Sequence, residues 1–215
     1  MIARGIVFQP ENSIDLEPDA ATWYDQSRYK NNGVITAGAG GWVQEPSGLW
    51  VYDFSGSVVT VTDGLDLDFT AEDMTWMWWG NQSTVAGDYM LYQKGDLNAD
   101  GIYIQYVANG SLRVVTSQAA AFQLSDIAVG SLVVGVWYFM VVRRIGASVR
   151  VFRDAIDITN VVGVHINPLT ASAKNTELGS TLIGRAGMFK VLKYALTAGQ
   201  ILKRYEADKW KFGVN

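Results

Sequence analysis

The residues of this chain that could bind an ion are oxygen donors in expected turns. The run Asp96-Leu97-Asn98-Ala99-Asp100-Gly101 places oxygen-bearing side chains at alternate positions before a glycine, as the first half of a calcium loop does. Val107 stands where an EF-hand would have its bidentate glutamate, so an EF-hand is excluded. Asp96, Asn98 and Asp100 are therefore candidate calcium ligands, with a plain turn between two strands as the alternative.

Two further charged clusters have open interpretations. Asp63, Asp66 and Asp68 would point their carboxylates to one side of an extended segment; they could serve a cation or form a solvated connecting loop. Four arginines on two neighbouring expected strands could bind an acidic partner or pair at the rim of the sheet: Arg143, Arg144, Arg150 and Arg153.

Aromatic rings are the other group suited to recognition, since the chain has 8 Trp and 10 Tyr. An aromatic ring supplies a large contact area, and Tyr and Trp add a polar tip. Tyr92, Tyr103 and Tyr106 lie on adjacent expected strands, where they could contact a glycan on a concave face. Cross-strand or core packing is the alternative.

Sequence patterns that are typical of catalytic sites are weak in this chain. The chain has no cysteine and one histidine, His165, between Val164 and Ile166, so a Ser–His or Cys–His nucleophile has little support. A glycine-rich phosphate loop between a strand and a helix is also missing from the sequence. We therefore expect no enzymatic activity.

Composition restricts the class of protein. A chain of 215 residues with 22 Gly and 4 Pro suits one β-sandwich domain, which we place at 21–215 behind an N-terminal arm at 1–20. The net charge of −4 argues against nucleic-acid binding, which depends on phosphate neutralisation. We find no signal peptide and no apolar run long enough to span a membrane. The expected location is a virion or the host cytoplasm.

Short strands separated by turns recur along the chain and predict an all-β, two-sheet antiparallel jelly-roll sandwich. Asn109-Gly110 predicts a hairpin turn. Thr197 and Gln200 form a capping box that predicts one short C-terminal helix at Ile201–Lys209. The expected strands are Leu49–Phe54, Ser57–Val61, Met74–Trp79, Tyr89–Gln93, Ile102–Val107, Leu112–Thr116, Val136–Arg143, Val149–Arg153, Leu182–Gly184 and Phe189–Lys193.

Several strands are apolar on both faces, most clearly Met74–Trp79. A half-exposed antiparallel strand would alternate apolar and polar residues. The second face must therefore be covered by the protein's own loops, by a ligand or by another chain. If another chain covers it, the assembly interface includes Trp78, Trp79, Trp210 and Phe212.

The order of motifs resembles the laminin-G-like, concanavalin A-like jelly-roll domain over about residues 25–205. Residues 25–33 (DQSRYKNNG) resemble its D-x-S-x-x-x-N-x-G loop, and residues 49–56 (LWVYDFSG) resemble its A-L-x-F-D-G strand. Further matches are 65–67 (LDL) with 74–79 (MTWMWW), 92–95 (YQKG), 136–142 (VWYFMVV), 183–185 (IGR) and 191–197 (VLKYALT).

This resemblance implies a jelly roll, and it implies a module that binds glycans or proteins or that completes a larger assembly. Enzymes resembling this fold set their two carboxylates on one strand as E-x-D-x-x-E, a spacing the chain lacks. The stretch before the last strand is shortened to 186–188, and the acidic residue of some relatives is missing there.

The sequence thus leads us to expect a non-enzymatic structural protein that acts by assembly, as a phage capsid decoration or tail-associated component. Its partners would be protein subunits in a homo-oligomer or on a particle surface, and calcium is its one candidate cofactor. The alternative is a carbohydrate-binding, lectin-like module or adhesin. A glycoside hydrolase with an unrecognised carboxylate pair is a third interpretation.

Overall fold

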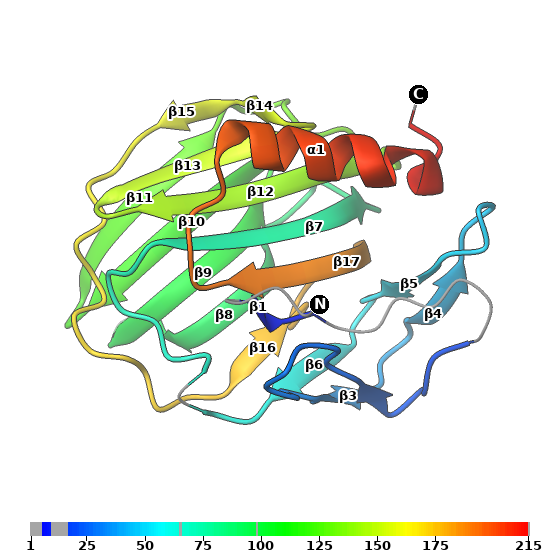
Figure 1. Ribbon diagram of the computed structural model, residues 1–215, viewed down its shortest axis with the longest axis horizontal. Helices are drawn as coiled ribbons and strands as arrows, with labels where there is room; N and C mark the ends of the chain where they lie inside the picture. The colour runs from blue at the N-terminus through cyan, green and yellow to red at the C-terminus, as the bar shows by residue number, and fades with distance from the viewer. Residues whose placement is uncertain (1–5, 10–16, 65, 98, 215) are drawn as a thin grey trace.

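The protein is a sandwich of two antiparallel sheets with one short helix against the outside of one sheet (Figure 1). The computed structural model describes residues 6–9, 17–64, 66–97 and 99–214. The expected all-β fold class with a single C-terminal helix is confirmed.

The eight-stranded sheet carries the helix on its outer face. Its strands, in spatial order, are β14 (Ile156–Asp157), β13 (Ser148–Arg153), β12 (Tyr138–Ile145), β7 (Met74–Gln82), β17 (Gly184–Leu192), β5 (Trp50–Asp53) and β4 (Gly41–Gln44), with β1 (Ile6–Phe8) paired to β17.

The nine-stranded sheet forms the opposite layer. Its strands, in spatial order, are β15 (Thr159–Val161), β11 (Ala121–Ile127), β10 (Ser111–Gln118), β9 (Asp100–Val107), β8 (Tyr89–Asp96), β16 (Thr176–Leu178), β6 (Val58–Val61), β3 (Gly33–Thr36) and β2 (Thr22–Trp23).

The main core fills the space between the sheets and is rich in aromatic rings. Trp78 of β7 and Tyr106 of β9 meet across this space, where Trp78 Nε1 donates a hydrogen bond to the Tyr106 hydroxyl at 2.8 Å. Their polar tips are therefore satisfied without water, as buried Trp and Tyr require.

A second core explains why β7 and β12 are apolar on both faces. The outer side of the eight-stranded sheet is covered by α1 (Ala198–Asp208) and the 3₁₀ helix η1 (Lys209–Phe212). Met77, Trp79 and Phe139 of the sheet pack there against Ile201 and Phe212. Among the interpretations left open by the sequence, coverage by the chain itself is the one observed.

The expected local signals match the structure. Asn109 and Gly110 have φ of 66° and 71° between β9 and β10. The Thr197 hydroxyl accepts a hydrogen bond from Gln200 N at 3.2 Å, and the Gln200 side chain accepts one from Thr197 N at 2.8 Å, completing the capping box.

The strand prediction differs from the structure in several places. Gly184, the end of the expected strand Leu182–Gly184, and most of the expected strand Phe189–Lys193 belong to one strand, β17, with a register irregularity between Gly187 and Lys190. The short strands β2, β3, β4, β14, β15 and β16 were not expected. β11 was not expected, although it pairs along its length with β10. β1, which falls within the expected N-terminal arm, belongs to the eight-stranded sheet.

The loop at residues 25–33 is organised by one carboxylate. Asp25 is 1% exposed and accepts hydrogen bonds from the backbone of Gln9, Ser27 and Asn31 and from the Ser27 hydroxyl. A buried carboxylate is stabilised when several N–H groups donate to it. The motif therefore has a structural role here.

In the described part of the chain, no helix has the length and apolarity needed to cross a lipid bilayer.

Candidate functional site

The candidate site lies on the outer face of the nine-stranded sheet, opposite the helix. Side chains of a strand alternate between the two faces of a sheet. On β9, Ile102, Ile104 and Tyr106 enter the core, so Tyr103 and Gln105 face outward. On this outer face two shallow cavities lie on the two sides of β9.

The first cavity has a polar lining and a volume of about 230 Å³. Gln93 Nε2 donates a hydrogen bond to Glu177 Oε2 at 2.8 Å on one wall. On the other wall Lys174 Nζ lies 3.2 Å from Asp96 Oδ2, in a pair that is mostly exposed and contributes little to stability. Its lining residues are Gln93, Gly95, Asp96, Lys174, Asn175 and Glu177.

The second cavity is mainly apolar and measures about 210 Å³. The ring of Phe122 is 50% exposed and Leu97 is 43% exposed. Arg113 Nε is buried and has no hydrogen-bond partner among the described residues. Its lining residues are Leu97, Gln105, Arg113, Val115, Phe122 and Leu124.

Tyr103 lies on β9 between strands that line the two cavities. It is the strand partner of Gln93 on β8 and of Val115 on β10, and these two residues line the polar and the apolar cavity. Tyr103 is only 2% exposed. Burial raises the pKa of its hydroxyl, and the nearby carboxylates of Asp96 and Asp100 raise it further, so the phenol stays neutral.

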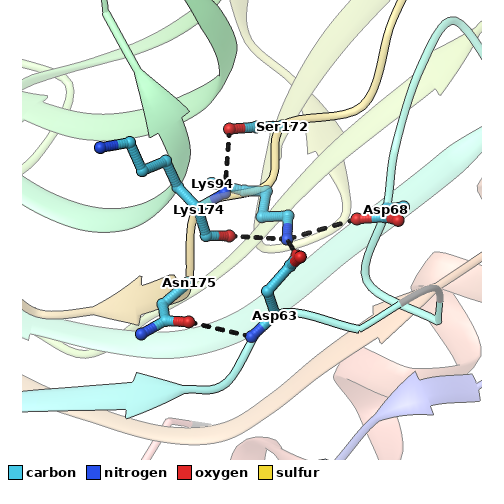
Figure 2. Close-up of polar contacts among 6 residues, drawn as sticks. All are labelled: Asp63, Asp68, Lys94, Ser172, Lys174 and Asn175. Carbon is cyan, nitrogen blue, oxygen red and sulfur yellow. Dashed lines mark hydrogen bonds and ion pairs between the residues drawn. The ribbon is translucent and has the colours of Figure 1, made fainter.

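A buried lysine fixes the wall of the polar cavity. Lys94 is 2% exposed; its ammonium donates to Asp63 and to the Lys174 carbonyl oxygen at 2.7 Å, and it lies 3.3 Å from Asp68 Oδ1 (Figure 2). The backbone N–H of Asp63 donates to Asn175 Oδ1 at 3.0 Å.

These contacts hold the segment before β16 against β8. The backbone of Lys174 and Asn175, which line the cavity, is therefore fixed in position. Two members of the acidic cluster, Asp63 and Asp68, therefore serve a cation, and that cation is the Lys94 ammonium.

The expected calcium ligands are only partly described. Asp96 and Asp100 are strand partners at the tip of the β8–β9 hairpin, and Asn98 lies outside the described residues. Within the described ranges there is no group of three or more His, Cys, Asp or Glu side chains placed to hold a metal ion. Calcium binding at this hairpin stays a prediction.

Two of the expected glycan contacts lie between the sheets. Tyr92 is 0% exposed and Tyr106 is 3% exposed. Burial raises the pKa of both hydroxyls. Their side chains follow the core-facing alternation of β8 and β9, so neither offers surface to a ligand.

The expected assembly residues are corrected in a similar way. Trp78 and Trp79 are both 0% exposed and Phe212 is 6% exposed, because their partners come from this same chain. These three side chains have no free surface for another subunit. Trp210 differs, since its side chain is 59% exposed.

His165 is a structural residue. Its two ring nitrogens hydrogen-bond the hydroxyls of Thr116 at 2.8 Å and Ser125 at 2.9 Å, and the residue is 0% exposed. Arg144, also buried, donates to the carbonyl oxygen of His165 at 2.6 Å. Burial and the neighbouring Arg144 charge lower the pKa of His165 to about 4. The neutral imidazole thus joins β10 and β11 to the segment before β16.

The sequence did not single out most of the lining of the two cavities. Phe122 and Leu124 alternate with Gln123 and Ser125, the period of a strand with one exposed face. That signal predicts β11, but it would have placed the apolar side chains in the core, whereas Phe122 is exposed and Ser125 is buried. Glu177 and Lys174 had no such signal, since β16 has only three residues.

The chain matches no protein-family model and no curated protein. Solved structures with the same fold include the binding domain of botulinum neurotoxin serotype C1, with a TM-score of 0.72, 12% sequence identity and coverage of 96% of this chain and 53% of that chain. The serotype D binding domain gives a TM-score of 0.69 and 11% identity, covering 94% of this chain and 52% of that chain.

A third similar structure concerns botulinum neurotoxin type C, whose cell entry is described as dependent upon interaction with two ganglioside molecules. It gives a TM-score of 0.72 and 13% identity over 96% of this chain and 52% of that chain. The present chain spans about half the length of these solved chains. The likeness supports the jelly-roll sandwich, whereas the laminin-G resemblance stays an expectation.

Proposed function

We propose that this protein is a non-catalytic binding module that holds a carbohydrate on the outer face of its nine-stranded sheet. The observation that supports this is the pair of cavities on this face, one polar and one apolar, with Tyr103 paired to one lining residue of each. A sugar ring presents hydroxyl groups at its rim and C–H groups on its faces. Binding sites for such ligands combine apolar contact area with a few well-placed polar groups.

Individual side chains suit each part of such a ligand. The exposed ring of Phe122 offers an apolar surface to a sugar face. Arg113 Nε is a buried donor that a ligand oxygen would satisfy. In the polar cavity, Gln93 and Glu177 are already joined by a hydrogen bond, which holds both side chains in place for further contacts.

Two other observations agree with this proposal. Two of the similar solved structures are described as binding domains, and the description of a third names gangliosides. His165 and Arg144, two buried polar side chains that could otherwise suggest a reactive site, have structural partners within the protein. Calcium at Asp96 and Asp100 would be an accessory to the polar cavity, and calorimetric titration with calcium tests it.

A glycan array followed by calorimetry with the best sugar tests the proposal. We expect binding to one sugar class and a loss of about tenfold in affinity for Phe122→Ala and for Arg113→Ala, the loss typical of truncating an interface anchor. Ile156→Ala is the matched control, because Ile156 is 65% exposed on the other sheet. An array without a reproducible sugar, or unchanged binding by Phe122→Ala, would refute it.

Particle assembly is the second candidate function, and a different surface favours it. β14 and β15 are the last strands of the two sheets at one edge of the sandwich (Figure 1). Residues 158–173 contain no Asp, Glu, Lys or Arg. Large apolar surfaces without charge are typical of interaction sites. The exposed apolar side chains at this edge are Ile156, Val161, Val162, Val164, Ile166 and Leu169.

Such an edge would serve a homo-oligomer or a viral particle, which is the assembly role expected from the sequence. Light scattering coupled to size-exclusion chromatography tests it. Wild-type protein should associate, and Val164→Asp, at a side chain that is 69% exposed, should shift it to monomer. A wild-type monomer at all concentrations would remove this candidate and leave the carbohydrate proposal intact.

A further inference from the structure

The charges of the chain are unevenly distributed. Residues 185–215 contain seven basic and two acidic side chains, a net charge of +5, whereas the rest contains ten basic and nineteen acidic side chains, a net charge of −9. The basic segment forms β17, α1 and η1 on the helix-bearing side of the sandwich (Figure 1). One side of an acidic protein therefore attracts anions.

Ion pairs within this segment involve two of its seven basic side chains. Lys209 Nζ lies 3.0 Å from Glu206 Oε2, and Lys211 Nζ lies 2.7 Å from Asp208 Oδ1. Both acidic side chains of the segment are used in these pairs. Among the described residues, Lys190, Lys203 and Arg204 form no ion pair.

A cavity lies beside these cations. It measures about 440 Å³ and runs along one face of α1, because residues three, four, seven and eight positions apart share a helix face. Its described lining residues are Gln200, Lys203, Arg204, Ala207 and Asp208. We call it the α1 cavity.

Lys190 approaches the same region from the sheet. On β17 it alternates with Phe189 and Val191, which belong to the core between the sheets, so its side chain points toward α1. Burial lowers the pKa of its ammonium, Arg204 and Lys211 lower it as well, and Asp208 opposes them. Lys190 is thus within electrostatic reach of Arg204 in the α1 cavity.

We propose that the α1 cavity binds the anionic groups of an acidic polysaccharide, whether sulfate, phosphate or carboxylate. The planar guanidinium of Arg204 fits two oxygens of such a group, and Lys203, which also lines the cavity, adds a point charge. A bound anion would also relieve the repulsion between Lys190 and Arg204. This site is on the other side of the sandwich from the proposed sugar face and does not depend on it.

Binding to dextran sulfate, with neutral dextran of the same length as reference, tests the proposal. We expect the wild-type protein to bind dextran sulfate alone, and more weakly as salt rises. Lys203→Glu/Arg204→Glu should lose about tenfold or more in affinity, given the strength of charge-assisted hydrogen bonds. Lys203 is exposed and Arg204 is partly exposed, so the fold should tolerate both changes.

The matched control is Arg28→Glu/Lys30→Glu, which changes the net charge equally at two exposed residues outside the basic segment. It should keep wild-type affinity, and Phe122→Ala should keep it too. Equal loss in both double variants, or no binding by the wild type, would overturn the proposal. Displacement by inorganic sulfate at the same sulfate concentration would overturn a polysaccharide as the ligand.

Discussion

The ring of Phe212 stacks on Trp79 with 4.4 Å between centroids and an interplanar angle of 13°. Tyr205 stacks on the same indole at 5.9 Å. The last residues of the described chain thus complete the outer core of the eight-stranded sheet. Residues that the sequence suggested for contact with another subunit stabilise this subunit instead.

Removing this stack should destabilise the fold. We expect Phe212→Ala to lower the free energy of unfolding by about 3 kcal/mol, the cost typical of truncating a buried phenylalanine, measured by urea denaturation. The tryptophan emission should shift to longer wavelength as Trp79 meets water. Trp210→Ala is the control, because that side chain is 59% exposed, and a loss as large as that of Phe212→Ala would contradict the assignment.

The stability should fall in mild acid because of His165. Its pKa is lowered from 6.5 to about 4 in the folded protein, so between these values the unfolded chain binds more protons. The contribution of the neutral His165 side chain to the free energy of unfolding is complete above pH 6.5 and is lost as the pH falls toward 4. This contribution amounts to roughly 3 kcal/mol.

Urea denaturation across this pH range measures the effect. His165→Gln should be less stable at neutral pH, and it should lack this part of the acid sensitivity. If the free energy of unfolding of His165→Gln falls with pH as steeply as that of the wild type, groups other than His165 cause the acid sensitivity.

The contacts of Lys94 with Asp63 and Asp68 predict that substitutions at these residues have non-additive effects on the free energy of unfolding. Lys94→Met should lower the free energy of unfolding by about 2–4 kcal/mol, because it leaves Asp63 and Asp68 facing each other without a cation. Adding Asp63→Asn and Asp68→Asn to that variant should recover part of the loss. If the triple variant is less stable than Lys94→Met, the carboxylates act independently of the lysine.

Gly80 is required by the contact between Trp78 and Tyr106. A Cβ at this position would lie 2.3 Å from the Tyr106 hydroxyl oxygen and 2.9 Å from Trp78 Nε1. Gly80→Ala should therefore cost about 1–3 kcal/mol, the range for overpacking a core. Tyr106→Phe removes the clashing oxygen, so the double variant should be more stable than the sum of the two single losses, as thermal denaturation would show.

Local patterns predicted much of the fold and little of the candidate site. The Asn109-Gly110 turn and the Thr197–Gln200 capping box depend on neighbouring residues alone, and both are present. The cavity lining comes from five strands, the turn between β8 and β9 and the segment before β16. The contact between Gln93 and Glu177 cannot be predicted from their spacing in the sequence, because it depends on which strands pair.

The sequence by itself determined the fold class, because strand alternation, turn residues and capping are properties of short segments. It also determined that the second face of β7 had to be covered. Tertiary structure decided what covers it, since only packing places Phe212 on Trp79. Packing likewise directs the Tyr106 side chain into the core and leaves Phe122 exposed. It also places the Lys94 ammonium against Asp63. Each of these outcomes depends on contacts between residues that are distant in the chain. The free energies of such contacts cannot be derived from a local sequence pattern.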